Sequence, residues 1–454
     1  MKTAFSLLLL ACAALAQFPS DAAIEAIIKE RIEVGKASTA IVVGTVDQQG
    51  IKVVGYGQVD AKTDRAPDGD TVFEIGSATK AFTAILLADM VSRGEMKLDD
   101  PVAKFLPPAV KMPTRGGKQI TLLDLATHTS ALPRMPDNFS PKDPHNPYAD
   151  YTVEQMYEFL SRHTLTRDIG AKYEYSNLGT ALLGHAIALK AGTTYEALVV
   201  DKICKPLGMV STRITLTPEL QARLTPGHTA TGAPAPNWDL PTFAGAGALR
   251  STVNDLTKFV AANLGLPMST MSAMIQKTHE IRIPAALPNM GIALAWHVSH
   301  AFGNDMVWHN GQTGGYHSFI GFDKKQRRGV VVLSNSAASI DDIAMHLLDS
   351  RNALTKPVAK TERKVAEIDR SIYDTYAGKY ELAPGVLFTI RRDGDRLLAQ
   401  LTGQSEIEIY PESKTDFFYT VVDAQLTFVV NDKGEATALT LHQAGQHPTA
   451  KRIK

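Results

Sequence analysis

Apolar and polar positions alternate with different periods along the chain, and each period predicts a different kind of element. Residues 21–34 carry apolar side chains at helical spacing, which predicts an amphipathic helix. Residues 38–60 are rich in Val, Ile and Gly and are interrupted by a polar turn at 47–50, a pattern typical of a β-hairpin. A run rich in Ala, Leu and Met over 77–93 then predicts a second helix.

Strand-like segments return late in the chain. Two apolar runs at 318–322 and 329–333 flank a polar turn, and a helix is predicted at 340–353. Between 99 and 240 the sequence alternates helical segments with long loops, of which 133–150 is one, and long ordered loops often line active sites. Strands at both ends with helices between them predict an α/β core whose sheet is assembled from both ends of the domain.

The last quarter of the chain has a different composition. Lys, Glu, Arg and Pro dominate near 356–369, which indicates a linker. Short alternating strands separated by turn residues follow from 376 to 453, and these predict a small barrel or sandwich. The chain is therefore divided into a signal peptide (1–16), a main domain (17–356), a linker (357–369) and a C-terminal domain (370–454).

The overall composition is that of a globular protein with balanced charge. The chain has 454 residues, with 47 basic and 47 acidic side chains. It therefore lacks the excess of positive charge that is typical of proteins that bind nucleic acid. No run after the N-terminus is long and apolar enough to span a bilayer. Of the two cysteines, Cys12 and Cys204, the second has apolar neighbours and is expected to be a buried small residue. The sequence does not indicate an oligomeric state.

The first residues have the pattern of an export signal. Lys2 precedes an apolar stretch over 4–15, and Ala14-Leu15-Ala16 forms a small-x-small cleavage site. The mature chain is then expected to begin near Gln17, in the periplasm or outside the cell. The alternative interpretation is a lipoprotein: Leu9-Leu10-Ala11-Cys12 resembles a bacterial lipoprotein box, with Cys12 as the lipidated residue.

Ser77-Ala78-Thr79-Lys80 is the place in the chain where a serine precedes a lysine by three residues. Positions i and i+3 lie on one face of a helix, so the Ser77 hydroxyl and the Lys80 amine can stand side by side. An adjacent basic group is the usual way to activate a serine hydroxyl, and a helix N-terminus favours a developing oxyanion. Alone, the pair is better explained as a first-turn serine and a solvated lysine.

Two further motifs follow in chain order. Tyr175-Ser176-Asn177 precedes a helical run; its phenol can shuttle a proton, and its amide can hold both Lys80 and a substrate carbonyl. His309-Asn310-Gly311, followed by Gln312, lies where a strand can present backbone N–H groups to a substrate. A cationic or hydrogen-bonding side chain at 309 would suit a substrate carboxylate. Lys190-Ala191-Gly192 fits the same pattern but is interpreted as helix termination.

The ordered set Ser-x-x-Lys, Tyr-x-Asn and His-x-Gly resembles the penicillin-recognising serine hydrolases, and within them the class C β-lactamase group with its DD-peptidase and esterase relatives. The resemblance covers residues 25–350 and includes the segments 122–130 and 245–256. It implies an α/β (α+β) β-lactamase/transpeptidase-like fold with a central antiparallel sheet and an all-helical region. A small C-terminal β-barrel-like domain is implied at 370–454, with a shielding or substrate-restricting role.

The resemblance also implies roles for single residues. Ser77 is the acylated nucleophile and Lys80 activates it. Tyr175 is the general base of acylation and protonates the leaving group, and which of Lys80 and Tyr175 takes the proton is left open. Asn177 binds Lys80 and the substrate amide.

On the late strand, His309 stands where many β-lactamases have lysine, and Asn310 and Gly311 are substrate-binding candidates. The backbone N–H groups of Ser77 and Gln312 are expected to form the oxyanion hole. Histidine carries no assured positive charge near neutral pH, and the family's His-x-Gly members, as the resemblance implies, include DD-peptidases and D-aminopeptidases. The resemblance therefore favours an exported D-alanyl-D-alanine carboxypeptidase/endopeptidase with a Ser77 acyl-enzyme.

Several other functions remain open: a class C-like β-lactamase, an esterase or D-aminopeptidase of the same fold, and a non-enzymatic periplasmic binding or regulatory protein. The substrate would be a D-Ala-containing peptide, a β-lactam or an ester. No cofactor is expected, because the 13 histidines are scattered and no zinc or phosphate-loop motif occurs.

Overall fold

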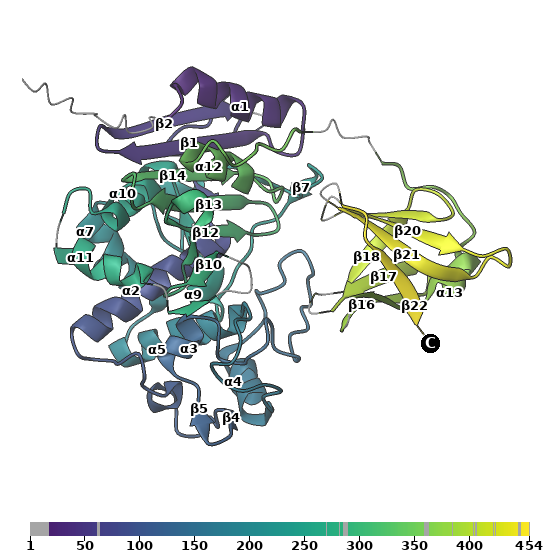
Figure 1. The fold of residues 1–454 in the computed structure, drawn as a ribbon, viewed down its shortest axis with the longest axis horizontal. Helices are drawn as coiled ribbons and strands as arrows, with labels where there is room; N and C mark the ends of the chain where they lie inside the picture. Colours follow the sequence, from purple (N-terminus) through teal and green to yellow (C-terminus); the bar gives the residue numbers. More distant parts are fainter. Residues whose placement is uncertain are drawn as a thin grey trace, which may run out of the picture.

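The computed structural model describes residues 18–60, 64–268, 270–280, 282–284, 289–357, 363–383, 385–402, 404, 406–420, 422, 424–443 and 446–453. A large antiparallel sheet with its helices forms one body, and a closed β-barrel forms a second (Figure 1). The predicted fold class is confirmed. The predicted signal peptide at 1–16 lies outside the described residues.

The main sheet has eight strands in the order β2-β1-β14-β13-β12-β11-β10-β9. Strands β1 and β14, from opposite ends of the domain, pair antiparallel, with Val43 opposite Val332. The expectation that both ends of the domain build the sheet is therefore confirmed. The strands are β1 Ala40–Asp47, β2 Gly50–Gly57, β9 Ile283–Pro284, β10 Met290–Ile292, β11 His297–Ser299, β12 Met306–Gln312, β13 His317–Asp323 and β14 Arg328–Ser334.

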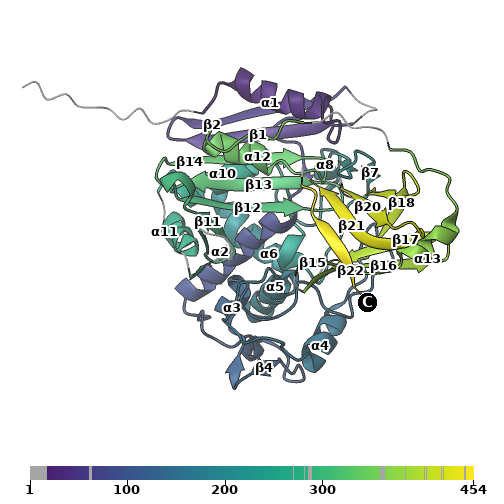
Figure 2. The ribbon, with the colours of Figure 1, turned by 45° about the vertical axis from the view of Figure 1, so that its right-hand side comes forward.

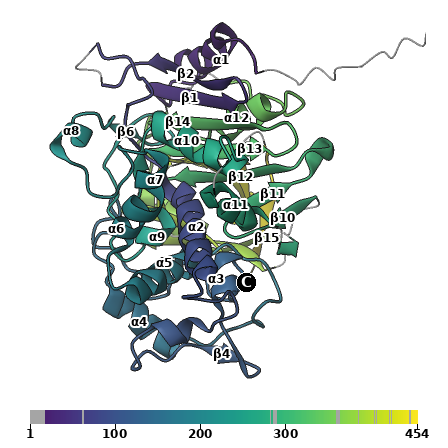
Figure 3. The same cartoon turned by 90° about the vertical axis from the view of Figure 1, so that its left-hand side faces the viewer.

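Helices cover both faces of this sheet, because alternate residues of the central strands point to opposite sides. On β1, Ile41 and Val43 pack with α1 (Asp21–Glu33) and α12 (Asp341–Leu348), whereas Val42 belongs to the cluster on the other face. That second face carries α10 (Val253–Leu264) and α2 (Thr79–Ser92). Figure 3 shows α2 between the sheet and the helices of a separate lobe.

The helical lobe holds α5 (Asn177–Ala191) near its centre. Ser176 caps the start of this helix by accepting a hydrogen bond from the Gly179 amide at 2.8 Å. Gly192, at φ +66°, ends it in the left-handed conformation, which confirms helix termination at 190–192. The other elements are η2 Val102–Phe105, α3 Leu122–Ala126, α4 Val153–Arg162, α6 Tyr195–Val199, η3 Val200–Cys204, α7 Lys205–Leu207, α8 Pro218–Gln221, α9 Ala244–Gly247, α11 Thr270–Gln276 and η4 Lys277–His279.

The C-terminal barrel closes through antiparallel pairing of β15 with β22. Its interior is filled by aromatic side chains, and the rings of Tyr376 and Phe428 stack at 4.2 Å. The bounds proposed for the linker, 357–369, stay a prediction. The barrel elements are η6 Arg370–Ile372, α13 Tyr373–Tyr376, β15 Gly378–Ala383, β16 Val386–Asp393, β17 Arg396–Leu401, β18 Ile407–Pro411, β19 Asp416–Tyr419, β20 Ala424–Val430, β21 Ala436–Gln443 and β22 Thr449–Ile453.

A short hairpin of the main domain, β6 (Gly227–His228) with β7 (Pro234–Ala235), contacts the barrel. In its turn, the Thr231 hydroxyl donates a hydrogen bond to the Thr420 carbonyl of the barrel at 2.7 Å. At its base, the His228 amide donates to the Gly315 carbonyl at 3.1 Å, just after β12. Figures 1 and 2 both show the barrel beside β7, so the barrel lies on the side of the domain where β12 ends.

The helix predicted at 340–353 is shorter than expected. It ends at Leu348, and Asp349 is extended. The Asp349 carboxylate accepts the backbone N–H of Arg351 at 3.0 Å, and this local turn competes with another helical turn. Cys204, by contrast, is buried as predicted. Across the described part of the chain, no helix combines the length and apolar character needed to cross a bilayer.

We expect Gly44→Val to weaken the contact between β1 and α10. A Cβ at Gly44 would lie 2.4 Å from Thr257 Cγ2 and 2.6 Å from Val253 Cγ1, so overpacking should lower the free energy of unfolding by about 1–3 kcal/mol. Urea unfolding followed by circular dichroism measures this. Lys52→Val, at an exposed position of β2, is the control, and equal stability of the two variants would contradict the assignment.

Candidate active site

Ser77 lies in a single 3-10 turn, η1 (Gly76–Ala78), directly before α2. Strand β3 (Phe73–Glu74) pairs with β8 (Arg250–Ser251) and delivers the chain to this turn. Gly76 adopts φ +47°, which glycine tolerates without a steric cost, and this turns the chain from strand into helix. The Ser77 side chain is partly exposed at the start of the otherwise buried helix.

Lys80 is fully buried beneath Ser77. Its Nζ lies 3.0 Å from Ser77 Oγ, 2.9 Å from Asn177 Oδ1 and 2.8 Å from the Ala246 carbonyl oxygen. Burial holds the pKa of Lys80 well below its usual value, and the nearby Arg134 guanidinium lowers it further. The predicted pair is therefore formed, and the amine is shifted toward its neutral form.

Two basic side chains lie beside the Tyr175 ring. Lys80 Nζ is 4.8 Å from the ring centroid and Arg134 Cζ is 5.1 Å from it. Burial raises the pKa of Tyr175, while a hydrogen bond with Ser77 and the Arg134 charge act in the opposite direction. The phenol is therefore held in its protonated form next to the serine.

Two histidines lie beside this tyrosine, and a third lies beside one of them. The His128 ring lies 4.6 Å and the His309 ring 6.4 Å from Tyr175, and His297 lies 5.3 Å from His309. Burial holds the pKa of His128 and His309 well below the usual histidine range and lowers the pKa of His297 to about 4. All three imidazoles are therefore neutral near pH 7.

The backbone of β12 lies directly against the serine turn. A Cβ at Gly311 would stand 2.0 Å from the Ile75 carbonyl oxygen and 2.8 Å from the Ser77 nitrogen. A Cβ at Gly76 would stand 2.8 Å from the Gln312 nitrogen. The two glycines thus allow the backbones that carry the Ser77 and Gln312 N–H groups to touch.

The side chains of β12 point alternately to its two faces. His309 is buried, and its Nδ1 lies 2.5 Å from the Asn310 carbonyl oxygen. The Asn310 amide donates to Asp341 of α12 at 2.6 Å, and the Gln312 amide donates to the Ala337 carbonyl at 3.1 Å. These two side chains are therefore directed to the α12 side, and a role of Asn310 in substrate binding stays a prediction.

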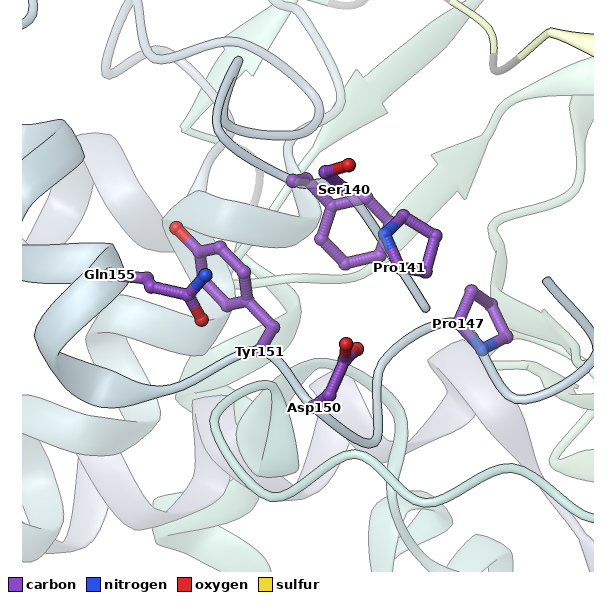
Figure 4. Close-up of a pocket in the computed structure, with 7 residues that line it drawn as sticks. Ser140, Pro141, Pro147, Asp150, Tyr151 and Gln155 are labelled. Carbon is purple, nitrogen blue, oxygen red and sulfur yellow. The ribbon is translucent and has the colours of Figure 1, made fainter. Parts of the chain in front are cut away.

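The loop at 133–150 contributes to the surroundings of the site through Tyr148. Its hydroxyl interacts with the Asn177 side chain, and its ring lies 5.3 Å from Trp238. Farther along, the loop encloses a cavity of about 10 Å³, room for one water, lined by Tyr151 and its neighbours (Figure 4). That cavity contains none of the predicted site residues.

Three features of the site were not identified from the sequence. The Ala246 carbonyl belongs to the backbone and has no signature in the sequence, although the segment 245–256 is part of the family resemblance. The sequence analysis did not identify His297 or Arg134. For Arg134 the available signal was its place just after the segment 122–130, which is part of the family resemblance. Within the described ranges, no group of three or more His, Cys, Asp or Glu side chains is arranged to hold a metal ion.

Comparison with known proteins places this site in a family. A sequence model described as Beta-lactamase matches residues 24–352, and a model described as a domain of unknown function matches 362–452. The D-alanyl-D-alanine-carboxypeptidase/endopeptidase AmpH of Escherichia coli (strain K12) is 34% identical over 232 residues, 51% of this chain and 59% of AmpH. The alignment thus spans about three fifths of that relative.

A second relative covers more of the chain. Penicillin-binding protein 4* of Bacillus subtilis (strain 168) is 25% identical over 429 residues, 88% of this chain and 91% of the relative.

Solved structures share the fold. A β-lactamase/D-alanine carboxypeptidase from Yersinia pestis complexed with citrate has a TM-score of 0.63 at 24% identity, covering 73% of this chain and 98% of its own. An octameric penicillin-binding protein homologue from Pyrococcus abyssi has a TM-score of 0.64 at 22% identity, covering 95% of this chain and 100% of its own. The resemblance noted from the motifs is confirmed: the chain belongs to the β-lactamase family of serine hydrolases.

Proposed function

We propose that this chain hydrolyses peptides that end in D-alanine through an acyl-enzyme on Ser77. The observation that carries the proposal is the contact between Ser77 Oγ and Lys80 Nζ at 3.0 Å, made by a lysine that is fully buried. The name of AmpH, a carboxypeptidase/endopeptidase, supports the peptide substrate. Export of the chain and lipidation of Cys12 stay predictions.

Lys80 is the base in this proposal. A neutral amine has two N–H groups and one lone pair, and its three neighbours match this set. The two N–H groups donate to Asn177 Oδ1 and to the Ala246 carbonyl. At the third contact, 3.0 Å from Ser77 Oγ, the lone pair of the neutral amine can take the hydroxyl proton. Ser77 Oγ attacks the substrate carbonyl carbon while its proton passes to Lys80 Nζ.

Tyr175 is the proton carrier to the leaving group. Because its pKa is raised by burial, its phenolate is disfavoured as a resting base. It can instead donate its proton to the departing amine as the bond between carbonyl carbon and nitrogen breaks, and recover a proton from Lys80. Lys80, protonated once it has taken the Ser77 proton, lies beside the Tyr175 ring and stabilises the transient negative charge on the phenol oxygen.

The negative charge on the carbonyl oxygen needs donors that are fixed in advance. The backbone N–H groups of Ser77 and Gln312 supply them in this proposal, and the close approach at Gly76 and Gly311 supports it. The barrel, joined to the domain near the end of β12, is proposed to restrict which substrates enter.

A β-lactamase and an esterase remain the alternatives for the same machinery. A panel of nitrocefin, a D-Ala-D-Ala peptide, a D-amino-acid anilide and a p-nitrophenyl ester separates them by turnover. Fast nitrocefin turnover would favour a β-lactamase, whereas ester cleavage alone would favour an esterase.

We expect a fluorescent penicillin to label wild-type protein on Ser77, as read by peptide mass mapping. Ser77→Ala should lose both the label and peptide hydrolysis. The matched control is Ser92→Ala, at the last residue of α2, where the hydroxyl donates to the Asp89 carbonyl of the same helix. A penicillin adduct on another residue, or full peptide hydrolysis by Ser77→Ala, would contradict the proposal.

We expect Gly311→Ala to slow acylation of Ser77 by about 100-fold, because the new Cβ would push β12 away from the Ser77 amide. Stopped-flow labelling measures the rate, and circular dichroism verifies the fold. Gly303→Ala is the control, since its Cβ would meet no atom within 4 Å and its φ of +75° makes local strain the main cost. Equal acylation rates in the two variants would remove the oxyanion-hole assignment.

The neutral histidines make stability depend on pH. In the unfolded chain each imidazole binds a proton near pH 6.5, whereas in the folded chain the pKa is lower, so the unfolded state binds more protons between these values. The free energy of unfolding should therefore fall as the pH falls from about 6.5, and for His297 the loss should continue down to about pH 4.

His297→Phe tests this dependence, because phenylalanine keeps the stacking on Trp308 but does not titrate. We expect it to recover up to about 3 kcal/mol of the stability that wild-type protein loses by pH 4. Urea unfolding at pH 7, 5.5 and 4 measures both proteins. His145→Phe, at an exposed loop position, is the control. A pH slope that is unchanged in His297→Phe would contradict the assignment.

A further inference from the structure

We propose that Arg134 binds a carboxylate group of the substrate and so selects acidic substrates over neutral ones. The inference rests on the proposed acyl-enzyme function of Ser77, and it names the residue that would set the substrate class of that site.

The backbone fixes Arg134 at the edge of the reacting groups. Its carbonyl oxygen accepts the amides of Asn177 and Leu178, at 3.1 and 3.2 Å, which ties it to the first turn of α5. Its guanidinium carbon lies 5.1 Å from the Tyr175 ring centroid, and Lys80 Nζ lies 4.8 Å from the same centroid. The guanidinium therefore lies next to the tyrosine that contacts Ser77.

The charge of Arg134 is exposed and unpaired. No hydrogen bond or ion pair joins its guanidinium to another residue within the described ranges, and its side chain faces solvent. The other arginines of the helical lobe behave differently. Arg115 pairs with Asp168 and Arg167 with Glu174, both at 2.8 Å, and Arg162 pairs with Asp137. An unpaired guanidinium at the site is therefore an exception in its own lobe.

The other basic groups at the site cannot perform this role. Lys80 is fully buried, with its amine against three partners. His309, the sequence-based candidate, is 1% exposed, and burial holds its pKa well below the usual histidine range, so it carries no charge near pH 7. Arg134 is the basic side chain of the site that is exposed to solvent.

The electrostatic reach of Arg134 covers the whole site. Burial lowers the pKa of Lys80 and His128 and the Arg134 charge adds to this effect, whereas burial raises the pKa of Tyr148, Tyr173 and Tyr175 and the Arg134 charge opposes it. A planar guanidinium lying by an aromatic ring can still offer two parallel N–H groups to a carboxylate, a geometry that an ammonium group does not provide. The chemistry therefore fits a substrate with a free carboxylate close to the bond that is cleaved.

Binding to Ser77→Ala tests the inference without requiring turnover. The probes are benzylpenicillin, which carries a free carboxylate, and its methyl ester, which does not; titration calorimetry measures both. We expect the acid to bind about 10- to 100-fold more tightly than the ester. Adding Arg134→Gln should reduce that preference to less than about threefold, and Arg134→Lys should retain part of it.

Lys190→Gln is the matched control, because it removes one positive charge from the far end of α5, about 20 Å from the first turn to which Arg134 is tied. It should keep the full preference for the acid. Equal binding of acid and ester, no binding of either, or a preference that survives Arg134→Gln would each overturn the inference. Wild-type labelling on Ser77 is a separate measurement, so failure of the proposed function would be seen independently.

Discussion

The complete burial of the Lys80 amine is the constraint on which the rest of the site depends. An ammonium group removed from water loses a large hydration energy, so the residue can be kept there only as a neutral amine or with good hydrogen-bond partners. The structure provides three oxygen atoms within 3.0 Å, from the serine turn, from the start of α5 and from α9. Any change that separates these elements would leave a buried amine without partners.

This requirement explains how the domain is assembled around α2. The helix carries Lys80 into the interface between the sheet and the helical lobe, where α5 and α9 pack against each other and against α2. Gly184 and Gly245 allow that close approach, since a Cβ on either would lie 2.9 Å from the other's Cα. The Lys80 amine and its partners are therefore positioned by packed helices and the serine turn, which suits chemistry that depends on fixed distances.

Charge is distributed unevenly around the serine. The buried groups, a lowered-pKa lysine and three imidazoles, are held neutral by desolvation, and Tyr175 is held protonated. The permanent charge of Arg134 stays at the solvent edge. Proton transfer can thus occur in the interior between neutral groups, while charge recognition is left to the surface, where a guanidinium need not lose its hydration before substrate arrives.

Local chain geometry determined much of what the sequence predicted. The spacing of Ser77 and Lys80 fixes them on one helical face, the alternation in 38–60 fixes the first hairpin, and Gly192 ends α5 through its own backbone conformation. In the last quarter of the chain, the alternation over 376–453 predicts short strands in a barrel or sandwich, and the pairing of β15 with β22, distant in sequence, decides for a closed barrel.

Only the tertiary structure decided which distant groups meet and which are dry. Lys80 contacts Asn177, 97 residues away, and Ala246, 166 residues away, and no local pattern encodes those distances. The sequence offered His309 as a possible cation, but packing removes its water and with it the charge. Arg134 became important for the opposite reason: it keeps its water, and only the packed structure shows that, among the described residues, no carboxylate pairs with it beside Tyr175.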